Sequence, residues 1–287
     1  MSETATGMYE FARQEYARLG IDTEEVLTKL AAKPISVHCW QGDDVLGFDQ
    51  AGGLSGGIQT TGNYPGRART FEELTADFDE AMSMVPGKKR INLHASYAVF
   101  TPENPWVDRD QLEYKHFEPW VAWARKRGYG IDFNPTVFGH PQMNNELSLS
   151  SPDKETRDFW IRHCKACRKI SQQIAEALDD ETLCNIWIPD GLKDVPADRY
   201  GLRLRLKESL DEIYTEKYDR VIDCCESKVF GIGLESMTVG SNEFYLAYAA
   251  THPGVYDLLD MGHFHPTENV ADKLSAVDGV LKVRIIK

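Results

Sequence analysis

Short apolar runs alternate with longer amphipathic stretches along most of the chain. The runs have the length of buried strands, and the stretches between them place apolar residues at helical spacing. Strands are predicted at 35–40, 90–95, 129–135, 183–188, 221–228 and 256–262, with a weaker seventh at 280–286. The residues before the first strand form two helices in the same pattern, so the alternation begins only after an N-terminal helical segment.

Capping residues mark where several helices begin and end. Thr70 followed three positions later by Glu73 predicts a helix start, and Gly128 predicts a helix end. Asp22 opens the second N-terminal helix, and Pro152 is expected at the first position of a long helix. The helices between and after the strands are predicted over 71–85, 111–126, from 151, 198–218, 241–250 and from 267.

Repeated strand–helix–strand units indicate a parallel sheet with helices on its faces. An open doubly wound sheet is the alternative. Its usual mark is a G-x-G-x-x-G turn between the first strand and helix, whereas the glycines at 52–57 lack that spacing and lie in a long loop. We therefore predict a single domain over residues 1–287, an α/β fold of the (β/α)8 TIM-barrel type with extra N-terminal helices. A closed barrel needs eight strands, so the barrel is expected to be incomplete and to lack its last β/α units.

Polar and aromatic side chains recur where the predicted strands end. In α/β barrels the active site is built from residues at the carboxyl ends of strands, which all meet at one mouth. The residues concerned are His38, Trp40, His94, Asn134, Trp187, Asp190, Glu226, Lys228, Asp260 and His263. Their repetition from strand to strand predicts a ring of functional groups around that mouth.

Three of these residues predict a metal site. Glu226 and Lys228 are two positions apart, so they share one face of a strand; a buried ion pair is the alternative explanation. Asp260 and His263 would lie on opposite faces of a straight strand, but Gly262 lets the chain bend as it leaves the sheet. Carboxylates with a histidine suit Mn²⁺, Mg²⁺ or Co²⁺. His265 is interpreted either as a packing or surface residue or as a support for the metal ligands.

Composition excludes several classes of partner. The net charge of −13 argues against nucleic acid and anionic membranes as partners, because both attract clustered lysine and arginine. No apolar run reaches the length of a membrane span, and the first residues do not read as a secretion signal. Six cysteines in 287 residues are not a disulfide framework, which predicts a reducing cytoplasm. The C-x-x-C sequence at 164–167 lies in a helical stretch without a second pair and is not interpreted as a zinc or redox motif.

Such a site suits the chemistry of an open-chain sugar. A bound divalent ion would hold neighbouring hydroxyl and carbonyl oxygens, and Lys228 could stabilise charge on the carbonyl oxygen. Trp187 would cover apolar C–H faces and exclude water. This arrangement favours movement of hydrogen between C1 and C2. A metal-dependent hydrolase is the alternative enzyme class, since the same ligands can activate water.

Several long segments of the chain resemble one known family. They are 38–44, 61–66, 185–191, 226–228, 230–233, 238–244 and 262–268. Together they are similar to the bacterial type of L-rhamnose isomerase, and the likeness extends from about Met8 to Ala276.

The resemblance implies a cytoplasmic homotetramer that interconverts the small sugars L-rhamnose and L-rhamnulose by a metal-assisted hydride shift between C1 and C2. It implies Mn²⁺ as cofactor, with Co²⁺ or Mg²⁺ as other possibilities. Glu226 and Asp260 resemble ligands of a substrate-binding metal, and His263 resembles a ligand of a second, catalytic metal. Lys228 resembles a catalytic lysine near the carbonyl. The substrate-binding residues implied are His94 and Trp187.

The chain departs from the family after Ala276. There the family continues with another metal-binding histidine, an Asp-x-Asp pair and a further aspartate, whereas residues 277–287 contain no histidine, and Asp272 and Asp278 do not form the Asp-x-Asp pattern. The two-metal site is therefore expected to be incomplete. An inactive, truncated remnant is the alternative to an active isomerase, and low or absent activity is expected of this chain.

Overall fold

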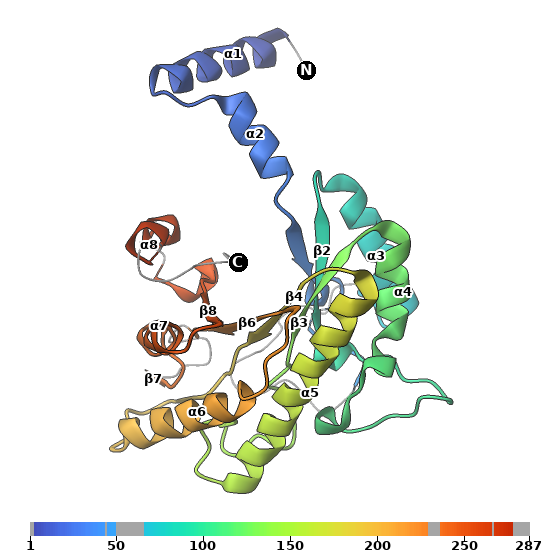
Figure 1. Ribbon diagram of the computed structural model, residues 1–287, viewed down its shortest axis with the longest axis vertical. Coiled ribbons are helices and arrows are strands. Elements are labelled where there is room, and N and C mark those ends of the chain that lie inside the picture. The colour runs from blue at the N-terminus through green and yellow to red at the C-terminus, as the bar shows by residue number, and fades with distance from the viewer. Residues whose placement is uncertain (1–2, 44, 50–65, 229–235, 266, 278–287) are drawn as a thin grey trace.

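A six-stranded sheet forms the centre of the computed structural model, which describes residues 3–43, 45–49, 66–228, 236–265 and 267–277. The strand order is β1-β2-β3-β4-β6-β8, and every neighbouring pair is parallel. The bounds are β1 Ile35–His38, β2 Lys89–His94, β3 Gly130–Asn134, β4 Thr182–Ile186, β6 Val221–Glu226 and β8 Val255–Leu258. The six predicted strands and their parallel arrangement are thus confirmed (Figure 1). The expected strand at 280–286 and the glycines at 52–57 lie outside the described residues.

The helices alternate with these strands as the sequence pattern predicts. Their bounds are α1 Glu3–Arg18, α2 Thr23–Ala31, α3 Phe71–Met84, α4 Glu118–Arg127, α5 Lys154–Leu178, α6 Arg199–Ile213, α7 Asn242–Thr251 and α8 Val270–Val277. The two expected N-terminal helices, α1 and α2, extend away from the sheet in Figure 1. A two-stranded antiparallel sheet, β5 Gly191–Leu192 with β7 Met237–Thr238, was not predicted; strands this short leave no period in the sequence.

Capping explains both the correct and the incorrect helix boundaries. Asp22 and Thr70 accept hydrogen bonds from amides in the first turns of α2 and α3, and Gly128 ends α4 with a left-handed φ of 68°. The predicted start of α5 at residue 151 is wrong. Asp153 accepts from the amides of the first turn and so fixes the N-cap beyond Pro152.

Other element boundaries also differ from the predictions, and β6 ends at Glu226, which places Lys228 beyond the strand rather than on it. α4 begins at Glu118 because two 3₁₀ turns, Arg109–Gln111 and Tyr114–His116, occupy the start of the predicted helix. α6 ends at Ile213, before the predicted end at Tyr218. β8 ends at Leu258, which places Asp260 beyond the strand rather than on it.

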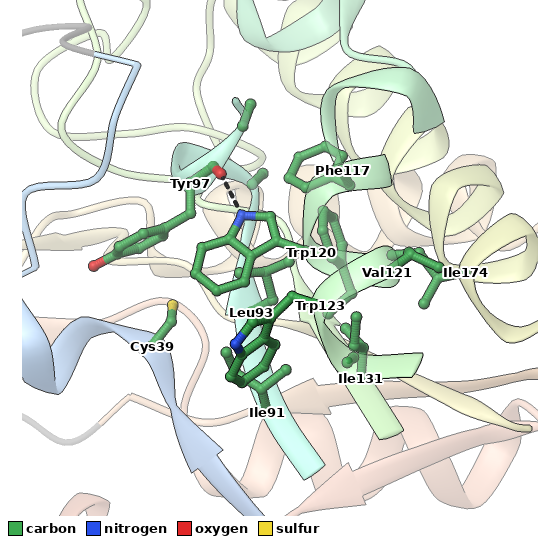
Figure 2. Close-up of a cluster of buried hydrophobic side chains, with 14 of the residues drawn as sticks. Cys39, Ile91, Leu93, Tyr97, Phe117, Trp120, Val121, Trp123, Ile131 and Ile174 are labelled. Atoms are coloured by element: carbon green, nitrogen blue, oxygen red, sulfur yellow. Dashed lines mark hydrogen bonds between the residues drawn. The ribbon is translucent and has the colours of Figure 1, made fainter. Parts of the chain in front are cut away.

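The two faces of the sheet carry different side chains. Ile91, Leu93, Ile131 and Phe133 belong to a core that includes residues of the covering helices. In Figure 2, Trp120 of α4 lies within this core and its indole nitrogen donates to the Tyr97 carbonyl over 2.9 Å. Since side chains alternate along a strand, the residues between the core positions project to the opposite face. That face is where the predicted site residues lie.

A buried ion pair joins α5 to the sheet. The guanidinium of Arg168 donates to both carboxylate oxygens of Asp223 on β6, each over 2.7 Å, and also to the carbonyls of Ile213 and Glu216. The two side chains are 1% and 5% exposed. Because neither charge reaches water, each depends on the other for compensation.

Removing one partner of this pair should destabilise the fold strongly. We expect Asp223→Asn to lower the free energy of unfolding by about 3–5 kcal/mol, because it leaves the Arg168 charge buried and uncompensated. Urea denaturation measures the change. The control is Asp158→Asn, which breaks the exposed Lys154–Asp158 pair and should cost less than about 1 kcal/mol. Equal effects of the two substitutions would contradict this account.

A second buried carboxyl makes stability depend on pH. Burial raises the pKa of Asp257 on β8 from 3.8 to about 7. The folded chain therefore holds this proton more tightly than the unfolded chain, and the free energy of unfolding falls as the pH rises between those values. Asp257→Asn removes the titration. The free energy of unfolding of this variant, minus that of the unsubstituted chain, should increase by about 2–3 kcal/mol between pH 5 and pH 8. Urea denaturation at the two pH values measures the difference. A difference that does not change with pH would refute the burial argument.

Candidate metal centre

Glu226 is the last residue of β6, and its carboxylate is buried at the carboxyl end of the sheet. Its side chain is held on two sides. Oε2 accepts a hydrogen bond from the amide nitrogen Nδ2 of Asn185 on β4, and Oε1 lies 3.3 Å from Nδ1 of His263. The neighbouring strands thus fix which oxygen faces the histidine.

A 3₁₀ turn after β8 brings Asp260 and His263 together. The turn spans Met261–His263, and the Asp260 carboxylate accepts from the Gly262 amide over 2.7 Å. With three residues per turn, positions three apart lie on the same side of the turn. The 3₁₀ turn, rather than the predicted bend at Gly262, therefore brings Asp260 and His263 together. A Cβ at Gly262 would lie 3.2 Å from Asp260 Oδ1, so the glycine permits the close approach of that carboxylate.

The tautomer of His263 follows from its neighbour. Its Nδ1 is hydrogen-bonded to the carbonyl oxygen of Ser227, and a carbonyl can only accept. Nδ1 therefore carries the proton, and Nε2 keeps the lone pair that a metal ion requires.

The three side chains offer donor atoms suited to a divalent cation. One atom each from Glu226, Asp260 and His263 lie within 4.8 Å of one another. Ions of this class bind oxygen and nitrogen at about 2.0–2.2 Å, so ligands on opposite sides of one ion are about 4.2 Å apart. A shift of a few tenths of an ångström would bring the set into reach of an ion. Two carboxylates and one imidazole also match the donor types that Mn²⁺, Co²⁺ and Mg²⁺ accept.

Lys228 is placed by the residues that follow β4. Its Nζ donates to the Pro189 carbonyl over 2.7 Å, and its backbone amide donates to Gly240. Asp190, which follows Pro189 in the chain, is fully buried and accepts four hydrogen bonds from the amides and hydroxyls of Ser148 and Ser150. Burial raises the pKa of the Asp190 carboxyl, and these four donors oppose that rise. The ammonium group of Lys228 is thus held in a fixed position beside the metal-ligand cluster.

Aromatic rings line the mouth from β1 to the cluster. The His94 ring lies 4.7 Å from that of Trp40 and 6.3 Å from that of Phe138. Trp187 continues the row, 5.8 Å from Phe138 and 6.1 Å from His263. The predicted residues His94 and Trp187 therefore lie along one wall. Trp187 Nε1 is buried and has no hydrogen-bond partner among the described residues.

A cavity of about 410 Å³ adjoins the cluster, and neither His94 nor Trp187 lines it. Lys228 and His263 line it together with Arg203, Thr238 and His265. The volume lies in the range of small-molecule sites. His265 itself is exposed and hydrogen-bonded to Thr267, which agrees with its interpretation as a surface residue.

Two site residues were missed by sequence reasoning. Asn185 lies in the segment 185–191 that resembles the family, but no role is predicted for it from the sequence, although a polar side chain within an apolar strand could have indicated its contact with Glu226. Phe138 follows β3 by four residues, and no spacing in the sequence connects it with the aromatic wall. All six cysteines are buried free thiols, those of the C-x-x-C sequence included.

The described part of the chain contains no helix with the length and apolar character of a membrane span.

Solved structures of sugar epimerases share the fold. An L-ribulose 3-epimerase matches 88% of this chain and 69% of its own length, with a TM-score of 0.52 and 14% identity. A D-allulose 3-epimerase from a Methylomonas species matches 89% of this chain and 71% of its own, with a TM-score of 0.51 and 11% identity. At these identities the similarity concerns architecture alone.

Sequence relatives are much more similar. The L-rhamnose isomerase of Mannheimia succiniciproducens is 56% identical over 277 residues, and that of Salmonella gallinarum is 52% identical over 271 residues. These alignments cover 96% and 93% of this chain but 65% and 64% of the relatives, so the chain spans just under two thirds of their length. The family described as L-rhamnose isomerase (RhaA) matches residues 4–283. The chain therefore belongs to the L-rhamnose isomerase family.

Proposed function

We propose that this chain carries the metal and sugar site of an aldose–ketose isomerase that interconverts L-rhamnose and L-rhamnulose by a hydride shift between C1 and C2. The observation that carries the proposal is the convergence of Glu226, Asp260 and His263 at the carboxyl end of the sheet. Membership of the family and the adjoining aromatic wall support it.

The chain's own residues would divide the work. A divalent ion held by Glu226, Asp260 and His263 would supply Lewis acidity toward adjacent sugar oxygens. Lys228 would hold its positive charge near the carbonyl oxygen, in the position that the Pro189 carbonyl fixes. Trp187 and His94 would bind the sugar, with the rings covering its apolar C–H faces and excluding water from the reacting carbons.

The finer assignments are also proposals. Mn²⁺ is the ion that we propose. Because Glu226, Asp260 and His263 converge on one position, we assign them to a single ion in place of the division between two metals that the resemblance implies. We further propose that residues 1–287 form part of a single barrel domain, that the subunits assemble as a homotetramer, and that the protein works in the cytoplasm. The six free thiols support the last of these, because reducing compartments keep thiols unpaired.

The direct test is a turnover assay. The purified chain is incubated with L-rhamnose and Mn²⁺, and L-rhamnulose is measured. We expect ketose to form at a low rate, and we expect Glu226→Gln to reduce that rate by at least about 100-fold, because the substitution removes an anionic metal ligand.

The control for this assay is Asp158→Asn, whose side chain lies in an exposed ion pair on α5. This variant should keep the rate of the unsubstituted chain. Mn²⁺ binding without any ketose would overturn the isomerase proposal and favour a remnant that binds metal but does not catalyse. Turnover unaffected by Glu226→Gln would show that the cluster is not the active site.

A further inference from the structure

Asn185 occupies an unusual position on β4. It is 1% exposed and lies in a strand whose other residues are Thr182, Leu183, Cys184 and Ile186. A buried amide within an apolar strand is costly unless its polar atoms are hydrogen-bonded. Nδ2 meets this requirement by donating to Glu226 Oε2, whereas Oδ1 is buried without a hydrogen-bond partner among the described residues. The contact therefore joins a buried amide to a buried carboxylate across two neighbouring strands.

The strand register explains why the two side chains meet. Asn185 pairs with Cys224 on β6, so Glu226 lies two residues further toward the carboxyl end on the same face. Leu183 and Cys224 belong to one small apolar cluster on that face. Asn185 thus lies between the apolar interior and the metal ligands. Its amide can reach only side chains that lie nearer the carboxyl ends of the strands, where Glu226 is.

The hydrogen bond distinguishes the two oxygens of Glu226. Oε2 is engaged by Asn185, whereas Oε1 lies 3.3 Å from Nδ1 of His263, on the side of the cluster. A carboxylate with one oxygen hydrogen-bonded in this way cannot rotate freely about its terminal torsion, so the orientation of the other oxygen is set before any ion arrives.

We propose that Asn185 is a positioning residue for the metal centre: it holds Glu226 Oε2 and thereby assigns Oε1 to the divalent cation. This inference rests on the proposed metal site, and it adds a residue that touches neither ion nor sugar. Supporting groups of this kind typically change metal affinity by about 10–100-fold.

The test measures Mn²⁺ affinity by electron paramagnetic resonance, independently of turnover. We expect Asn185→Leu, which removes the amide at similar volume, to weaken Mn²⁺ binding by about 10–100-fold. Asn185→Ser is the second variant, for use if the leucine variant does not fold. Its hydroxyl is too short to reach Glu226, so the same loss is expected.

The control is Ser209→Ala. Ser209 is also a buried polar residue, but it lies on α6 and its hydroxyl donates to the Leu149 carbonyl. This variant should lose stability in urea and keep the Mn²⁺ affinity of the unsubstituted chain. If Asn185 acts in folding alone, the Asn185 variant and the control should both keep the Mn²⁺ affinity of the unsubstituted chain.

Glu226→Gln separates the two proposals. If it weakens Mn²⁺ binding and the Asn185 variants bind within twofold of the unsubstituted chain, the positioning role is refuted and the metal site stands. If Glu226→Gln has no effect on Mn²⁺ binding, the metal site itself is refuted, and the role of Asn185 with it. Absence of ketose in the turnover assay would leave both affinity results unchanged.

Discussion

The carboxylate of Glu226 is 1% exposed, and burying a charge of this kind requires compensation from its surroundings. The parallel sheet supplies that compensation in one place, because all six strands deliver their carboxyl ends to the same edge. Asn185 comes from the strand on one side, and Asp260 with His263 comes from the turn after the strand on the other. A divalent cation would complete the neutralisation of the two carboxylates. The site is thus a consequence of strand direction and of the need to satisfy one buried charge.

The two faces of the sheet have separate roles. The helix-facing side holds the apolar core and the Arg168–Asp223 pair, which fix the position of α5 against β6. The opposite face is apolar near Leu183, Cys224 and Leu258 and polar toward the carboxyl ends. Stability therefore depends mostly on residues that do not contact the site. Because of this separation, the Trp187 ring can lie against His263 even though its indole nitrogen has no hydrogen-bond partner among the described residues.

The sequence predicted the strands well because each is a short apolar run between polar segments, and it predicted that the candidate ligands lie close together because strand ends share an edge. It failed where one local hydrogen bond decides the outcome. Asp153 caps α5, so the helix begins later than predicted, and Asp260 caps a 3₁₀ turn that no hydrophobic period indicates. The contact of Asn185 with Glu226 depends on register between strands 41 residues apart, and Phe138 reaches the aromatic wall through a loop. Neither relation can be read from spacing along the chain.

The central claim is that Glu226, Asp260 and His263 share a divalent cation. The most direct measurement is a crystal structure of the chain grown with Mn²⁺, with anomalous diffraction recorded above and below the manganese absorption edge. Our account predicts an anomalous peak at about 2.0–2.3 Å from Glu226 Oε1, with Asp260 and His263 among its ligands. Manganese peaks located elsewhere, with these three side chains bonded only to protein or water, would contradict it.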